Sequence, residues 1–124
     1  MKLELLPMLF TVCQLENVQQ ADFSAPFTFF ARTDEEISFV CPLENCPPNA
    51  LNRQDGWRCL RILGPLDFSL VGILSQIADC LAKAKVPIFA VSTYNTDYVL
   101  FREAYLETAL KALKNMGYEI APCR

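Results

Sequence analysis

Two polar segments in the second half of the 124-residue chain carry the groups best suited to binding a small charged molecule. The first is GPLDFSLVG at 64–72, which leads into a predicted helix. The first turn of a helix has backbone amides without intrahelical partners, and the helix dipole favours negative charge there. We therefore expect a carboxylate to be bound by up to four amides, those of Ser69, Leu70, Val71 and Gly72.

The second segment, STYNTD at 92–97, supplies hydrogen-bond acceptors at a predicted hairpin turn. Together with Asp67 from the first segment, Asn95 and Asp97 can accept hydrogen bonds from an ammonium or a guanidinium group. A small ligand that carries both a carboxylate and a cationic group is an amino acid. If the two segments lie side by side, they predict an amino-acid pocket.

The same residues also have ordinary structural roles. Asp67 and Ser69 can cap the helix, Asn95 and Asp97 can form the turn, and Gly72 can allow close packing of the helix. The residue types alone leave both interpretations open.

Residues that would indicate catalysis or a metal centre are scarce. The sequence has no histidine, and its carboxylates and lysines form no recognisable catalytic motif. Its four glycines are isolated, so no phosphate-binding loop is present. Cys41 and Cys46 are spaced CxxxxC without the histidines of common zinc sites. We predict no enzyme activity, no cofactor and no metal.

The six cysteines favour a reduced compartment over a disulfide scaffold, because no export signal is recognisable at the N-terminus. Cys13, Cys59 and Cys80 lie in apolar segments and are expected in the core as free thiols. A thiol-based redox role for Cys46 or Cys123 has no CxxC motif to support it. The sequence thus predicts a cytoplasmic protein.

Charge and hydropathy exclude two classes of partner. The net charge is −3, and no stretch gathers lysine and arginine as a phosphate-binding face requires. No apolar run reaches the roughly twenty residues that span a bilayer. We predict no nucleic acid and no membrane partner.

The elements that position the two polar segments follow from residues 56–124. A short strand at 57–64, an amphipathic helix from about 70 to 84, a hairpin with its tip at 95–97, a second helix at 103–116 and a last strand at 118–121 are predicted. This order is the split βαβ arrangement of an α+β, ferredoxin-like βαββαβ fold.

The first half of the chain reads as a smaller, mostly β module at 1–55. Strands are predicted at 5–15, 26–32 and 36–43, the last two forming a hairpin, and a connector at 44–56 contains two prolines. We place the second module at 56–124. Its sheet has one face without helices, so packing against the first module or formation of a homodimer is expected.

The sequence resembles a known family most clearly in GPLDFSLVGIL and IFAVSTYNTDYVL. These segments are similar to a branch of the ACT-domain family that includes small bacterial proteins and the arginine sensor CASTOR. The resemblance implies paired ACT modules, a degenerate one at the N-terminus, and regulation by an amino acid without catalysis. It assigns ligand binding to Asp67, Phe68, Ser69, Leu70, Val71, Gly72, Ser92, Thr93, Tyr94, Asn95 and Asp97.

This chain departs from the family pattern at two places. Asn95 stands where the family often has aspartate, and AKAKVP at 82–87 replaces a turn that commonly contains glycine. A second function remains open beside the sensor: a ligand-independent interaction module that uses the uncovered sheet face and edge strands.

Overall fold

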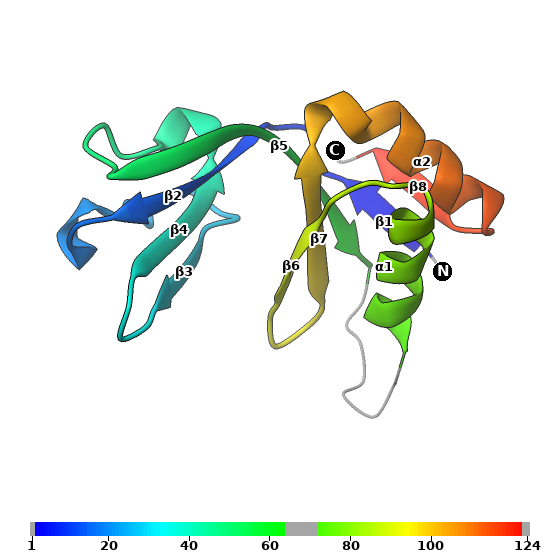
Figure 1. Ribbon diagram of the computed structural model, residues 1–124, viewed down its shortest axis with the longest axis horizontal. Coiled ribbons are helices and arrows are strands. Elements are labelled where there is room, and N and C mark those ends of the chain that lie inside the picture. The colour runs from blue at the N-terminus through cyan, green and yellow to red at the C-terminus, as the bar shows by residue number, and fades with distance from the viewer. Residues whose placement is uncertain (1, 64–71, 123–124) are drawn as a thin grey trace. The chain divides into compact units, whose positions relative to one another are not determined.

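The computed structural model describes residues 2–63 and 72–122 of the chain, which forms two compact units (Figure 1). Unit 1 comprises residues 1–7 and 58–124, and unit 2 comprises residues 8–57. The long strand β5 (Asn52–Ile62) begins in unit 2 and ends in unit 1.

Unit 1 has the predicted α+β, ferredoxin-like architecture. The end of β5 is followed by α1 (Ile73–Lys83), the strands β6 (Phe89–Ser92) and β7 (Asp97–Arg102), α2 (Leu106–Asn115) and β8 (Glu119–Pro122). The 3₁₀ turn η3 (Glu103–Tyr105) precedes α2. Strands β6 and β7 form the predicted antiparallel hairpin, with Ser92 opposite Asp97.

Both helices pack their apolar residues against one face of the unit 1 sheet. The buried residues come from the helices, the strands and the turn after α1, and are Leu3, Leu60, Ile62, Ile77, Cys80, Leu81, Val86, Val99, Phe101, Ala109 and Leu113. The helices contribute Ile77, Cys80, Leu81, Ala109 and Leu113 to this core. Met116, the last residue of the predicted second helix, lies one residue beyond the end of α2 and is 67% exposed.

The described helices begin later than the sequence predicts. Gly72 has φ 82°, in the left-handed region, and α1 starts at Ile73. The predicted N-cap, Ser69, lies outside the described residues. The second helix, predicted from Glu103, starts at Leu106 because the 3₁₀ turn η3 occupies its first three positions.

Both helices end in a Schellman motif, in which a left-handed residue lets two amides bind the last free carbonyls. After α2 the left-handed residue is Gly117 (φ 96°), and Tyr118 N donates to Leu113 O over 3.1 Å. After α1 it is Lys85 (φ 62°), and Val86 N donates to Leu81 O over 2.9 Å. The AKAKVP sequence therefore forms the turn that glycine would form, but with a strained lysine.

Replacing that lysine should stabilise the protein. Lys85→Gly removes the left-handed strain of a side chain, a gain only partly offset by the flexibility of glycine in the unfolded chain. We expect the free energy of unfolding to rise by about 0.5–1 kcal/mol, measured by urea denaturation. The control Lys111→Gly, in the middle of α2, should lower it by about 1 kcal/mol. Loss of stability in Lys85→Gly would contradict this explanation of the turn.

The N-terminal strand lies in the sheet of unit 1, although the sequence assigned residues 1–55 to a separate module. Strand β1 (Lys2–Leu5) pairs antiparallel with β5 and parallel with β8, so the strand order of unit 1 is β6-β7-β5-β1-β8. The predicted strand at 5–15 is divided. Pro7 has no amide to donate, and the pairing with β5 ends at the bond from Leu6 N to Cys59 O (3.0 Å).

Unit 2 is an antiparallel sheet with strand order β3-β4-β2-β5. Its strands are β2 (Phe10–Leu15), β3 (Phe29–Arg32), β4 (Ile37–Pro42) and the first half of β5, with the 3₁₀ turns η1 (Val18–Gln20) and η2 (Leu43–Asn45). The predicted β3–β4 hairpin is present. The predicted connector at 44–56 is shorter, because its last residues, from Asn52 onward, extend β5.

Candidate functional site

The β6–β7 turn gathers the second set of predicted site residues at one end of the unit 1 sheet. Ser92 and Asp97 close the turn as a strand pair. Thr93 N donates to Thr96 O over 2.8 Å, and Thr93 Oγ1 donates to the same carbonyl over 3.0 Å. Thr93, Tyr94 and Asn95 are exposed, Tyr94 by 83%, so the turn presents polar groups and one aromatic ring to solvent.

Thr96, which sequence reasoning missed, fixes this turn against the sheet. Its side chain is only 7% exposed, and Oγ1 donates to Ile62 O over 2.6 Å. Ile62 is the last residue of β5, and the chain continues from it towards 64–72. A threonine among polar turn residues gives no sequence signal of burial, whereas here its hydroxyl binds the turn to the strand that leads into the other predicted segment.

Most of the first predicted segment, 64–72, lies outside the described residues. Asp67, Phe68, Ser69, Leu70 and Val71 are not described, so their placement stays a prediction. Gly72 is exposed, and its carbonyl accepts the first described bond of α1, from Gln76 N over 2.9 Å.

The turn of the β6–β7 hairpin is repeated in unit 2. ARTDEEISFV at 31–40 and VSTYNTDYVL at 91–100 align threonine with threonine. Thr33 N donates to Glu36 O over 2.9 Å, as Thr93 N does to Thr96 O. In both turns the threonine Oγ1 accepts the amide three residues later, over 3.1 Å in unit 2 and 3.4 Å in unit 1. The two units thus present the same four-residue turn.

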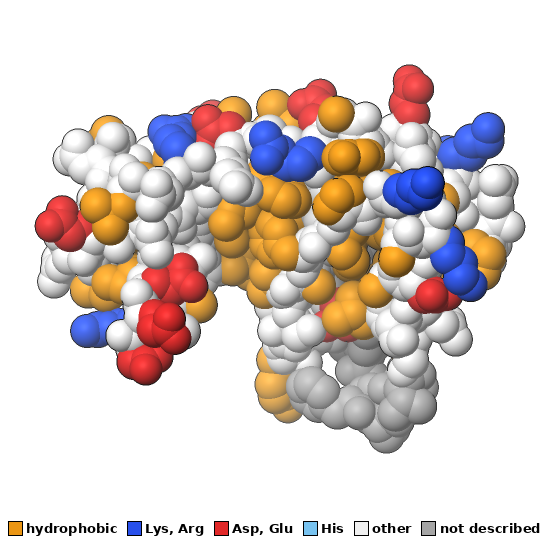
Figure 2. All heavy atoms as spheres, viewed as in Figure 1, with side chains coloured by type: hydrophobic (Ala, Val, Ile, Leu, Met, Phe, Trp, Pro, Cys, Tyr) orange, Lys and Arg blue, Asp and Glu red, His pale blue; other side chains and the backbone are white. Residues whose placement is uncertain are grey.

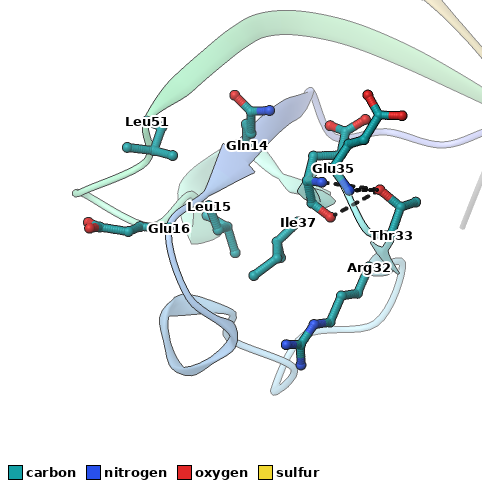
Figure 3. A pocket seen from close by; sticks show the side chains of 9 residues that line it. Gln14, Leu15, Glu16, Arg32, Thr33, Glu35, Ile37 and Leu51 are labelled. Carbon is teal, nitrogen blue, oxygen red and sulfur yellow. Dashed lines mark hydrogen bonds between the residues drawn. The ribbon is translucent and has the colours of Figure 1, made fainter.

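A pocket of about 390 Å³ adjoins the turn in unit 2 (Figure 3). Leu15 and Ile37 lie between Glu16 on one side and Arg32 on the other. The remaining lining residues come from the ends of β2, the turn and the start of β5, and are Gln14, Thr33, Glu35, Glu36 and Leu51. The pocket therefore has apolar side chains between groups of opposite charge.

The charges of this pocket are exposed to solvent. Among the described residues Arg32 takes part in none of the ion pairs, which join Lys2 to Glu119, Arg53 to Asp55, Arg61 to Glu4 and Lys83 to Asp79. Acidic side chains gather at the tip of the β3–β4 hairpin (Figure 2), where Asp34, Glu35 and Glu36 are exposed. A guanidinium near carboxylates is suited to a ligand that carries both charges.

On the sheet of unit 1, neighbouring strands also carry a partly buried ion pair. Arg61 Nε donates to Glu4 Oε1 over 2.9 Å, and hydrogen bonds to Glu4 and, more weakly, Tyr98 raise the pKa of Arg61. Arg61 therefore stays charged and joins three strands, β1, β5 and β7. Its partners indicate a structural role.

The described residues offer neither a metal centre nor a spanning helix. They contain no group of three or more cysteine, aspartate or glutamate side chains placed to hold a metal ion. Within 2–63 and 72–122, no helix is long and apolar enough to cross a membrane.

The chain belongs to the ACT-domain family. A sequence profile of the ACT domain matches residues 52–115, more than half of the chain. This stretch runs from β5 to the end of α2 and includes the β6–β7 turn.

Curated relatives of the chain are described as cytosolic arginine sensors for mTORC1, subunit 1. The Rattus norvegicus protein is 34% identical over 98 residues, which are 73% of this chain and 30% of that protein. The Homo sapiens protein is 39% identical over 59 residues, 47% of this chain and 18% of that protein. The chain thus spans less than a third of the length of these relatives.

Solved structures share the fold over nearly the whole chain. Protein Atu0741 from Agrobacterium tumefaciens superposes with a TM-score of 0.86 at 27% identity, covering 99% of this chain and 93% of that chain. Aspartate kinase from Synechocystis superposes with a TM-score of 0.69 at 17% identity, covering 99% of this chain and 28% of that chain. At that identity the likeness to the kinase concerns the fold alone.

Proposed function

We propose that this ACT protein is a non-catalytic, cytoplasmic sensor that binds an amino acid between the β6–β7 turn and the segment 67–72. One contact carries this proposal: the bond from Thr96 Oγ1 to Ile62 O. It holds the turn at the end of β5, from which the chain continues into 64–72. Ligand-binding residues on both segments would then lie within reach of one small molecule.

Different residues of the two segments bind the two charged groups of the ligand. In this proposal the amides of 69–72 bind the carboxylate, because these residues directly precede α1 in the sequence and the dipole of α1 favours a negative group at its N-terminal end. Asp67, Asn95 and Asp97 accept hydrogen bonds from the ammonium or a cationic side chain. Phe68, Ser92, Thr93 and Tyr94 complete the walls of the pocket. With Asn95 in place of a carboxylate, the site holds one negative charge fewer for a cationic side chain.

Two comparisons support this proposal. The Rattus norvegicus protein, related over 73% of this chain, is described as an arginine sensor, and the ACT domain is identified over the segments concerned. A ligand that binds one state of the protein better than another shifts the population towards that state. The output of the sensor is then a change in homodimer assembly or in the affinity for a partner protein.

A second candidate function, a ligand-independent interaction module, is favoured by one surface of unit 2. Phe23 is 59% exposed and Phe30 37% exposed, and the two rings contact each other edge to face at 5.6 Å between centroids. Exposed aromatic rings in contact are typical of protein interfaces.

A thermal-shift screen against the twenty amino acids separates the two functions, because a ligand of the folded state raises stability by mass action. At a ligand concentration of about 100 times Kd, the gain is about 2.7 kcal/mol. We expect one amino acid to raise the Tm, and Asp97→Ala to abolish this shift.

Arg32→Ala is the matched control, since Arg32 flanks the equivalent turn in unit 2. It should leave the shift intact. If no amino acid raises the Tm at about millimolar concentration, the interaction module is the better explanation. If Arg32→Ala alone abolishes the shift, the ligand binds in unit 2 and the proposed site is wrong.

A further inference from the structure

Two thiols lie in the core of unit 2, and a third packs against it. Cys13 on β2 and Cys41 on β4 are buried together with Leu15 and Phe39. Cys46, the residue after η2, packs against this cluster but is partly exposed. All three are free thiols. The cluster thus combines two inaccessible sulfurs with one that solvent can reach.

The two buried thiols are poorly placed to react with each other. Cys13 lies opposite Phe39, and Cys41 lies opposite Thr11, so the two cysteines are diagonal neighbours across the β2–β4 ladder. Diagonal neighbours have Cα atoms about 7–8 Å apart, beyond the usual range of a disulfide. With exposures of 3% and 0%, neither gives a small oxidant access.

Two hydrogen bonds fix the segment that contains Cys46 against the rest of unit 2. The segment that follows Cys46 returns to β2, where Leu51 N donates to Gln14 O over 2.8 Å. Gln20 Nε2 donates to Asn49 O over 3.0 Å, which fixes the same segment at a second point. Cys46 packs against the cluster that contains Cys13, where the Cys13 thiol donates to Phe39 O over 3.4 Å and the Cys46 thiol to Pro47 O over 3.6 Å.

We propose that Cys13 and Cys46 form a reversible disulfide when the protein is exposed to oxidised glutathione. The accessible Cys46 reacts first and the buried Cys13 resolves the adduct. Both cysteines lie in unit 2, whereas the residues of the proposed pocket belong to unit 1, so this proposal does not rest on amino-acid binding.

The reaction proceeds by two thiol–disulfide exchanges. The Cys46 thiolate attacks one sulfur of oxidised glutathione, whose S–S bond breaks and releases one glutathione thiolate. Cys13 then loses its proton to solvent, and its thiolate attacks the Cys46 sulfur and releases the second glutathione. Two protein thiols are oxidised to one disulfide, and one oxidised glutathione is reduced to two thiols.

The second exchange should depend strongly on pH. In the reduced protein the pKa of Cys13 is raised to about 11, chiefly by burial, with a smaller contribution from the Cys46 thiol that is lost once Cys46 carries glutathione. Below that pKa the Cys13 thiolate is a minor species, and its fraction rises about tenfold for each unit of pH. Resolution of the mixed disulfide should therefore accelerate as pH rises from about 7 to 9, in proportion to that fraction.

Mass spectrometry of the whole chain treated with oxidised glutathione tests the proposal. We expect the loss of two hydrogens, and after digestion of the alkylated product a cross-linked peptide pair that joins Cys13 to Cys46. In the Cys13→Ser variant the reaction should stop after the first exchange, which leaves one glutathione bound to Cys46. Cys46→Ser should form neither that adduct nor the cross-link, and Cys41→Ala should still form the cross-link.

Other outcomes would overturn the assignment. A cross-link between any other pair of cysteines, or a glutathione adduct on Cys46 that persists in the wild type at pH 9, contradicts it. The peptide map of the oxidised wild-type protein identifies the cross-linked cysteines even if a variant fails to fold. A resolution rate that does not change with pH would exclude Cys13 as the resolving thiol.

Discussion

Leu3→Ala is expected to lower the free energy of unfolding of unit 1 by about 2–5 kcal/mol. Leu3 is fully buried and packs in the core beneath the two helices. Its strand pairs with β5 on one side and β8 on the other, opposite Ile62 and Ile120. The shortened side chain leaves a cavity in the centre of the sheet, where neighbouring strands cannot close around it.

The neighbouring position provides the control. Lys2 lies on the same strand, is exposed, and forms only a surface ion pair with Glu119 at 3.6 Å. Lys2→Ala should change stability by less than about 1 kcal/mol. Urea denaturation followed by circular dichroism measures both variants. Equal effects of the two substitutions would show that β1 is not an inner strand of unit 1.

Phe39→Ala is expected to have an equally large effect in unit 2, about 3–5 kcal/mol. Phe39 is fully buried on β4, and its ring contacts Phe23 and Phe30 edge to face, with centroids 5.6 and 6.4 Å away. Truncation removes both ring contacts and the largest side chain of the buried cluster that Phe39 forms with Cys13, Leu15 and Cys41.

Phe23→Ala is the matched control, because the same aromatic cluster is truncated at a ring that is 59% exposed. We expect it to cost about 0.5–1.5 kcal/mol, the value of a lost aromatic pair with little change in burial. Hydrogen exchange localises each effect: Phe39→Ala should lower protection in β2 and β4. Unchanged protection of these strands would contradict the assigned core.

Much of unit 1 could be predicted from the sequence because its elements are encoded locally. Apolar residues recur every three to four positions in both helices, and Gly117 marks the end of the second. The β6–β7 hairpin follows from two β-rich runs separated by small polar residues. These local patterns predict the helices and the hairpin without any information on contacts between residues that are distant in the sequence.

The placement of β1 could not be predicted in this way. LELLPMLFTVCQL reads as one apolar run, and nothing within it says that the part before Pro7 pairs with β8, which is more than a hundred residues away. Likewise, residues 52–56 (NRQDG) are polar and include a glycine, yet pairing with β2 makes them part of β5. Long-range pairing overrides local preference in both cases.

The candidate site was predicted in part. The turn at 92–97 was identified from its polar residues, whereas the contribution of Thr96 depends on a bond to a strand more than thirty residues earlier. The repeat of this turn at Thr33 was visible in the sequence, but its significance becomes evident only when both hairpins show the same hydrogen bonds.

The repeated turn distinguishes the two units chemically. The turn in unit 1 has an aromatic ring and neutral polar groups before Asp97, and the turn in unit 2 has three consecutive acidic residues, 34–36. The proposed function therefore requires the amino acid to bind at the first turn and not at the second. A measurement that distinguishes the two turns must identify the residues that contact the amino acid as well as the affinity.

This difference is tested by the amide chemical shifts of the ¹⁵N-labelled protein, titrated with the amino acid found by the thermal screen. We expect the largest changes at Ser92–Asp97 and at the amides of 69–72, and we expect Asp97→Ala to remove them. Changes centred on 32–37, or spread evenly over the chain without saturation, would contradict it.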